Sequence, residues 1–293
     1  GVRVATSLMD VRDHRLAERY GPDRYTDYLR GRVMKAWGTG HYDKGNHTCY
    51  VVHQGMLLYP IAELVRLIRS GGRATAILRR TADELERQVR EVIAEIEPNW
   101  RNGPHAGMGY YVSPVGRVSP NNYQTAMGRV FLALGDRDSR NRARRIMKYI
   151  RSKLTLDRER DCWLWAYSQK GPDGPAGIGE DVSHGAITGH FLYLCWERKI
   201  GFSKRDVGRL TRTFTRAIHL GDGKMAGILG VFEPGAPKYT AHVGRWAHLA
   251  RFDVAVDHAI RAYIERTGSQ GAFSGPTGAL SFAYLARAEQ LRR

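Results

Sequence analysis

Two carboxylates and an imidazole lie close together in the segment from Glu180 to Gly185, which reads EDVSHG. An apolar helical period begins here, and the N-terminal end of a helix favours negative charge. A carboxylate beside an imidazole can orient, protonate or neutralise a bound acid, which is general acid–base chemistry. Capping of the helix by Asp181 or Ser183, with His184 at the surface, explains the same pattern equally well. The sequence leaves both interpretations open.

A phenol, an imidazole and two cations follow one another in the segment 238–246. Tyr239 and His242 lie between Lys238 and Arg245. Cations near a phenol lower its pKa from about 10 because they favour the phenolate. Tyr239 is therefore a candidate acid and base, and the structural alternative is an aromatic loop that packs onto the helix below it.

Three more polar side chains stand at the starts of predicted helices. Asn121 and Asn122 follow a loop that contains Pro and Gly, and they can cap the helix or hold a carboxylate with their amides. His53 stands near the start of an apolar helix. It either faces a cavity or is a core histidine with its hydrogen bonds satisfied.

Helices must position these groups, because apolar residues repeat at helical spacing along most of the chain. Thr81 with Glu84 and Ser203 with Asp206 match capping boxes, and Gly135 stands where a helix should end. The predicted helices cover residues 57–68, 85–96, 127–134, 143–154, 187–195, 207–218, 246–266 and 278–291. Paired antiparallel helices predict an all-α protein, a solenoid or an α/α toroid.

Long irregular segments separate the helix pairs at residues 99–120, 158–181 and 221–243. Loops of this length in a compact domain usually carry function or are disordered, and their aromatic content favours function. We expect them to line a cleft at one end of a complete or incomplete toroid. No linker-like tract divides the chain, so the sequence predicts a helical N-terminal arm at 1–37 and one domain at 38–293.

The charge balance favours an anionic partner. The 293 residues include 46 Lys and Arg against 29 Asp and Glu, a formal charge of +17, and 42% are hydrophobic, as in a globular protein. Nucleic acid and acidic polysaccharide both fit this charge. Much of the excess lies in 140–145 and 204–216, which we interpret as solvated helix faces. No zinc-finger or RNP signature is present, so nucleic acid is the less favoured partner.

Several other classes of protein and of functional site lose support. Cys49, Cys162 and Cys195 have neither disulfide-scaffold nor zinc-site spacing and are expected to be buried. No spacing requires a metal, and no nucleotide-loop, zinc-protease or serine-hydrolase motif occurs. The longest stretch without charged residues, 45–62, contains two His, a Gln and a Pro, so we expect no membrane span. The chain begins at Gly1 without Met, which predicts a processed or engineered start.

In their order along the chain, four segments resemble the α/α-toroid polysaccharide lyases that cleave uronate polymers such as alginate and glucuronan, and related uronyl epimerase-type helical domains. The resemblance covers roughly residues 40 to 265. Its motifs are Tyr50 to Met56 (YVVHQGM) with Tyr59-Pro60, Asn121-Asn122 with Arg129, Trp163-x-Trp165-x-Tyr167 leading into Glu180 to Gly185, and the loop from Tyr239 to Arg245.

The resemblance implies β-elimination without a cofactor. A group neutralises the uronate carboxylate, a base removes the C5 proton, and an acid protonates the departing O4. It implies Tyr239 as base and acid, His184 as base or neutraliser, a protonated Glu180 with Asn122 at the carboxylate, and Arg245 as a stabilising cation. Sugar subsites would be formed by His53, Tyr111, Asn121, Trp163, Trp165, Tyr167 and His242. An acidic polysaccharide substrate implies a secreted or periplasmic location.

Three alternatives remain. A uronyl C5-epimerase shares the proton abstraction but returns the proton to C5. An inverting glycoside hydrolase on the same scaffold would use Glu180 or Asp181 as acid and Asp253 or Asp257 as base, with carboxylates about 6.5–9.5 Å apart. A protein that only binds polyanions would retain binding without Tyr239 and His184.

Overall fold

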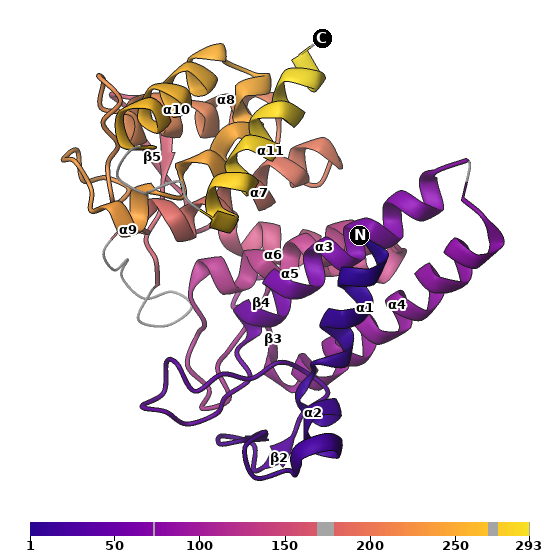
Figure 1. Cartoon of the computed structure of the whole chain (residues 1–293). Coiled ribbons are helices and arrows are strands. Elements are labelled where there is room, and N and C mark those ends of the chain that lie inside the picture. Colours follow the sequence, from indigo (N-terminus) through magenta and orange to yellow (C-terminus); the bar gives the residue numbers. More distant parts are fainter. Residues whose placement is uncertain (73, 169–178, 269–274, 293) are drawn as a thin grey trace. The chain divides into compact units, whose positions relative to one another are not determined.

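The computed structural model describes residues 1–72, 74–168, 179–268 and 275–292, and most of them are helical (Figure 1). Contacts between residues group the chain into two compact units. Unit 1 comprises residues 1–119 and 123–146, and unit 2 comprises residues 120–122 and 147–293. The predicted all-α class is confirmed, because the strands of the described residues are only two or three residues long.

Unit 1 is built on two helix hairpins. The long helices α3 and α4 pack against each other, and α5 is joined to α6 by a short turn at Gly135, whose φ of 72° confirms the predicted helix end. The elements are α1 (Val2–Asp10), α2 (Asp13–Tyr20), β1 (Thr26–Asp27), β2 (Arg32–Val33), α3 (Val51–Ser70), α4 (Ala76–Ile96), the 3-10 helix η1 (Glu97–Asn99), β3 (Trp100–Asn102), β4 (Gly109–Tyr111), α5 (Asn121–Leu134) and α6 (Arg137–Arg151).

The residues up to Trp37, predicted as an N-terminal arm, are fastened to α3 by hydrogen bonds. The Trp37 amide donates to Gln54 Oε1 at 3.1 Å, and Gln54 Nε2 donates to the Trp37 carbonyl at 2.8 Å. The Trp37 indole donates to the Leu8 carbonyl at 3.0 Å. By length and composition alone, α3 would be long and apolar enough to cross a membrane. Its packing against α4 and its buried Gln54 are those of a core helix.

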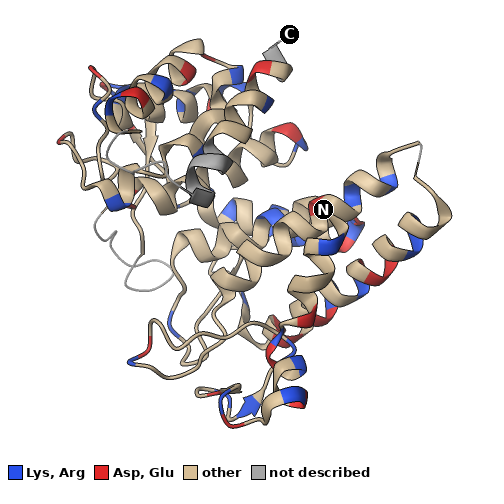
Figure 2. Cartoon of the chain, in the orientation of Figure 1, with Lys and Arg blue, Asp and Glu red and all other residues tan. Residues whose placement is uncertain are grey.

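The start of α4 corrects one prediction. The helix begins at Ala76, with Thr75 as its N-cap, and the predicted capping box of Thr81 with Glu84 is wrong. Thr81 lies inside the helix and donates to the Ile77 carbonyl at 3.0 Å. The apolar stripe starts only at Ala82, so the exposed first turns carry no amphipathic signal. Figure 2 shows charges of both signs along α4, where Arg and Glu side chains pair at i,i+3 and i,i+4 spacing.

Unit 2 is arranged around α7, whose residues from Gly185 to Cys195 are all buried. A helix that is apolar on all sides belongs in the centre of a core. It contacts α8, α9 and η3, and η3 in turn contacts α10 and α11. The elements are β5 (Thr155–Asp157), β6 (Cys162–Leu164), α7 (Val182–Glu197), α8 (Lys204–Arg212), the π-helical turn η2 (Thr213–Ile218), α9 (Pro237–Thr240), the 3-10 helix η3 (Val243–Arg251), α10 (Val254–Thr267) and α11 (Gly275–Arg292).

Local signals in unit 2 were partly predicted. Ser203 and Asp206 form the expected capping box at the start of α8. The single helix predicted at 246–266 is wrong, because η3 ends at Arg251 and α10 begins after Asp253. Asp253 Oδ1 accepts the Ala255 amide at 2.9 Å and so caps a new helix.

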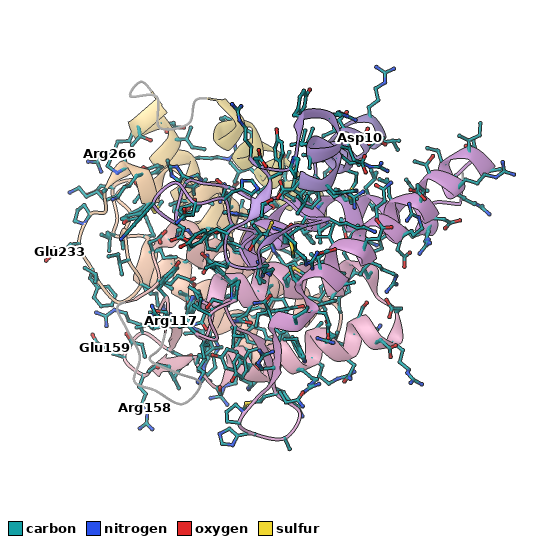
Figure 3. All side chains as sticks on the ribbon, turned by 90° about the horizontal axis from the view of Figure 1, so that it is seen from below. Asp10, Arg117, Arg158, Glu159, Glu233 and Arg266 are labelled. Atoms are coloured by element: carbon teal, nitrogen blue, oxygen red, sulfur yellow. The ribbon has the colours of Figure 1, made fainter. Side chains whose placement is uncertain are left out.

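The residues that the structure describes form three two-stranded antiparallel sheets, which the sequence did not predict. They pair β1 with β2, β3 with β4, and β5 with β6, the second within the irregular segment 99–120. Two or three residues are too few to establish a period of two, so the sequence carries no recognisable strand signal here. In Figure 3, Arg158 and Glu159 at the β5–β6 turn and Glu233 in the segment 221–243 extend into solvent.

The arginine-rich stretches are not merely solvated faces. On α6, Arg140 and Arg144 are exposed, but Arg142 lies 4.2 Å from the Trp100 ring centroid and Arg145 donates to the Met108 carbonyl at 2.9 Å. In unit 2, Arg209 and Arg212 of α8 both pair with Asp161. The three cysteines are buried with free thiols, as predicted.

Candidate active site

Glu180 lies in an extended segment between two other chain segments of unit 2. Its amide donates to the Trp165 carbonyl at 3.2 Å, and its carbonyl accepts the Leu229 amide at 2.9 Å. A side chain at the preceding Gly179 would overlap the Leu229 carbonyl, so this close approach requires glycine. The backbone on both sides therefore fixes where the Glu180 side chain begins.

The Glu180 carboxyl is fully buried. Its Oε2 accepts hydrogen bonds from the Trp165 indole and, at 3.0 Å, from Thr188 Oγ1. Within the part of the chain that the structure describes, Oε1 is buried and has no hydrogen-bond partner. Burial raises the pKa of Glu180 to about 8, against the opposing effect of the two donors. At neutral pH this group is mainly a neutral carboxylic acid.

Asp181 and His184 form a dyad at the first turn of α7. Asp181 Oδ1 accepts the amides of Ser183 at 3.0 Å and His184 at 3.1 Å, and its Oδ2 lies 2.5 Å from His184 Nδ1. Burial raises the pKa of Asp181, but the hydrogen bonds from His184 outweigh it and the pKa is lowered overall. The hydrogen bond to Asp181 raises the pKa of His184. Asp181 is therefore the predicted cap of α7, and the same carboxylate also pairs with the His184 ring.

The start of η3 adds one polar and one charged side chain, His242 and Arg245, to this dyad. The pKa of His242 is lowered to about 4 by burial and then by the Arg245 charge, and the charges of Asp181 and His184 also act on it. Burial likewise lowers the pKa of Arg245, whose charge lowers that of His184. His242 and Arg245 therefore belong to the same electrostatic cluster as the dyad. His242 Nδ1 and Arg245 Nε are buried without hydrogen-bond partners among the described residues.

Tyr239 lies on α9, half-buried, and the His242 amide donates to its carbonyl at 3.4 Å. Of the two cations predicted near its phenol, Lys238 has its Nζ 4.8 Å from the ring centroid. The loop that precedes α9 is closed on itself at two glycines. A Cβ at Gly227 would lie 2.8 Å from Gly235 Cα, and one at Gly235 would overlap Gly227. This backbone contact fixes the base of the loop.

Three aromatic side chains and one amide side chain hold the chain segments next to the dyad in place. Trp165 stacks on Trp246 with ring centroids 6.2 Å apart, and the Trp246 indole donates to the Val182 carbonyl at 3.0 Å. The Tyr167 ring meets His184 edge-on at 5.8 Å. Asn121 Nδ2 donates to the Ala166 carbonyl at 2.8 Å. This hydrogen bond anchors the segment after β6 that carries Trp165 and Tyr167.

The other predicted residues have local surroundings of their own. Asn122 is fully buried in the first turn of α5. Trp163 stacks with Arg209, whose guanidinium carbon lies 5.2 Å from the ring centroid. The hydrolase alternative named Asp253 and Asp257 as candidate bases. Asp253 caps α10, and Asp257 pairs with Arg261 at 3.1 Å in the same helix.

Two of the predicted subsite residues lie in unit 1. His53 packs among aromatic rings, 5.4 Å from Tyr42 and 5.6 Å from Tyr50 between centroids. Tyr111 is fully buried against Trp100, so it presents no surface to a ligand in this conformation. This burial argues against the predicted subsite role of Tyr111.

Sequence reasoning missed Thr188, which donates to Glu180 from two turns further along α7. Its signal was a hydroxyl within an otherwise apolar helical segment. Among residues 1–72, 74–168, 179–268 and 275–292, no group of three or more His, Cys, Asp and Glu side chains is arranged to hold a metal ion.

No protein-family model and no curated protein sequence matches this chain. Solved structures are similar in fold. The GH76 α-mannanase of Bacteroides thetaiotaomicron aligns with a TM-score of 0.56 at 10% identity, over 92% of this chain and 70% of the mannanase. A family 76 glycoside hydrolase from a bovine strain of that species aligns with a TM-score of 0.53 at 11% identity, over 98% of this chain and 55% of the hydrolase. A cellobiose 2-epimerase from Bacillus thermoamylovorans aligns at a TM-score of 0.47 and 9% identity, over 98% of this chain and 70% of the epimerase. The two hydrolases share the predicted α/α-toroid fold with this chain.

Proposed function

We propose that this chain is a carbohydrate-active enzyme that cleaves a uronate-containing polysaccharide by β-elimination. The single observation that carries the proposal is the Asp181–His184 dyad. The half-exposed imidazole of His184 is held by the carboxylate that caps α7. The Arg245 guanidinium and the protonated Glu180 carboxyl lie in the same cluster. Abstraction of a proton next to a carboxylate requires a positioned base and a group that stabilises the resulting charge.

His184 is the proposed base. Its side chain is 46% exposed and that of Asp181 only 13%, so the imidazole is the member of the dyad that a substrate can reach. Its Nε2 would take the C5 proton while Asp181 stabilises the imidazolium at Nδ1. The electron pair of the C5–H bond moves into the carboxylate and then forms the C4–C5 double bond as the C4–O4 bond breaks. Tyr239 would give its hydroxyl proton to the departing O4.

Arg245 is the proposed partner of the substrate carboxylate. The resemblance to toroid lyases implied Glu180 with Asn122 for this role, but both side chains are fully buried. A buried neutral Glu180 instead limits the negative charge around the dyad, which leaves the site favourable for an anionic sugar. The substrate is a polymer outside the cytoplasm, so we place the enzyme in the periplasm or outside the cell.

Glycoside hydrolysis is the second candidate. A carboxylic acid whose pKa is raised by burial is what a general acid needs, and the two family 76 hydrolases share the fold. The full burial of Glu180 weighs against it. A C5-epimerase, the third candidate, would use the same dyad and return a proton to C5.

The proposal is tested by incubating the protein with glucuronan, alginate or polygalacturonate and measuring near-ultraviolet absorbance. Elimination creates an unsaturated uronate, which absorbs there. We expect the parent to produce absorbance, and His184→Ala and Tyr239→Phe to abolish it. His258→Ala, at an exposed histidine of α10, and Tyr20→Phe, at an exposed tyrosine of α2, are matched controls that should keep the parent rate.

Reducing ends without absorbance would replace the lyase by the hydrolase. Deuterium uptake from solvent without cleavage would identify the epimerase. Binding with neither product would identify a protein that only binds polyanions.

A further inference from the structure

An open hollow of about 500 Å³ lies in unit 2 where α7 ends and α8 begins. Its side chains combine one indole with three cations. The hollow is lined by Arg151, Trp196, Lys199, Gly201, Phe202, Ser203, Lys204 and Asp206.

The charge of this hollow is positive. Lys199 and Lys204 are exposed, and Arg151 is half-exposed. The one carboxylate of the lining, Asp206, accepts hydrogen bonds from Arg151 at 3.0 Å and from the Ser203 hydroxyl at 2.7 Å. Three cations against one engaged carboxylate leave a local charge of +2. An anionic group that enters meets two ammonium ions and no unengaged acid in the lining.

The indole of Trp196 is held in place by other aromatic rings. Phe252 meets it edge-on at 4.8 Å and Tyr193 lies at 5.9 Å between centroids. The Arg251 guanidinium carbon lies 5.3 Å from its ring centroid. A fixed ring with a partly exposed surface loses little conformational entropy when a ligand packs on it.

We propose that this hollow is an accessory binding site for an acidic glycan chain, with Trp196 packing on a sugar ring and Lys199 and Lys204 binding its carboxylates. The choice of ligand class rests on the proposed function. Trp196 lies twelve residues after His184 in α7, which places the two about 18 Å apart along the helix. The hollow is therefore a separate site, which a long polymer can use and a short oligosaccharide at the dyad need not touch.

A pair of charge reversals tests the site against its own control. Lys199→Glu with Lys204→Glu changes the net charge by −4, and Arg137→Glu with Arg140→Glu makes the same change on the exposed start of α6. We measure Kd by calorimetry for glucuronan, alginate and polygalacturonate at low salt. We expect the lysine pair to raise the Kd of the bound polymer about tenfold or more, and the arginine pair to change it less than about twofold. Trp196→Ala should raise it about fivefold to tenfold.

Equal effects of the two charge reversals would overturn the site, because attraction would then follow net charge alone. Failure to bind any of the three polymers would also overturn it. Tighter binding of single-stranded RNA, lost in the same variants, would reassign the hollow to nucleic acid. Binding is read without turnover, so selective loss of binding in a protein that yields no ultraviolet product supports this site and contradicts only the proposed reaction.

Discussion

Asp181 holds His184 twice, since one carboxylate oxygen accepts the His184 amide at 3.1 Å and the other lies 2.5 Å from its Nδ1. The backbone and the ring of the same residue are thus fixed by one side chain. The first turn of α7 and the proposed base are consequently one structural unit. A substitution at Asp181 must be designed to separate the two effects.

Asp181→Asn and Asp181→Ala make this separation. Asparagine keeps a capping oxygen, whereas alanine removes the cap and should cost about 1 kcal/mol of stability. Both remove the negative charge, so the pKa of His184 should fall and kcat/KM should drop about a hundredfold or more. Imidazole NMR titration and unfolding by denaturant measure the two effects. An unchanged His184 pKa in Asp181→Asn would contradict the dyad.

The dyad also predicts a pH window for stability. The raised pKa of His184 stabilises the fold below the unfolded value of about 6.5, and this contribution is lost as pH rises through the folded pKa. The lowered pKa of Asp181 stabilises the fold above about 3.9, and this contribution is lost as pH falls through the folded pKa. The stability difference between the parent and Asp181→Asn should therefore be larger at pH 5.5 than at pH 9. Denaturant midpoints at the two pH values check this.

Glu180→Gln should stabilise the protein at alkaline pH. The folded state keeps the Glu180 proton up to pH about 8, whereas the unfolded chain loses it near 4.3. The free energy of unfolding of the parent therefore falls as pH rises between these values, by roughly 2–5 kcal/mol from this group. Glutamine stays neutral, so the variant should equal the parent near pH 4 and exceed it at pH 8. Parallel pH profiles for both proteins would refute the buried acid.

Trp165→Phe should raise the pKa of Glu180 further. The substitution keeps an aromatic ring against Trp246 but removes the indole donor to Oε2, which favours the charged carboxylate. Carbon-13 NMR of labelled glutamate side chains reads the titration directly. Trp163→Phe is the matched control, because no hydrogen bond of its indole to Glu180 is present, and it should leave the titration unchanged.

Gly189→Ala should destabilise unit 2 by about 1–3 kcal/mol, because the new methyl would lie 2.8 Å from the Trp246 ring. The ring is hydrogen-bonded to the start of α7, so it cannot move without disturbing the dyad. Gly208→Ala in α8 is the control, with its nearest neighbour a flexible Arg212 terminus at 3.7 Å. That variant should gain about 0.5–1 kcal/mol. Thermal unfolding of both variants compares the two sites.

The sequence predicted those features of the fold that depend on residues close together along the chain. The capping box of Ser203 with Asp206 and the turn at Gly135 are set by residues within a few positions, and the amphipathic period of α8 is equally local. The capping box predicted at Thr81 was wrong because the first turns of α4 are exposed and extend beyond its apolar stripe. The EDVSHG segment was found because both members of the dyad lie in one helical turn.

The sequence could not predict the surroundings of Glu180. Its donors, Trp165 and Thr188, and its backbone partner Leu229 are fixed by pairing between segments distant along the chain. Whether a carboxyl is exposed or fully buried depends on this pairing and on nothing in the motif itself. The placement of Tyr111 in the core of unit 1 depends in the same way on the β3–β4 pairing.

The contact between Gly227 and Gly235 sets a rule for engineering this protein. Neither position tolerates a side chain, and the close approach is mutual, so exchanging both residues together offers no relief. A library of loop variants should hold these two positions and Leu229 constant and vary the exposed residues 231–234 between them. The glycine contact would then keep the two ends of the loop together, so new loop sequences would be carried on an unchanged backbone.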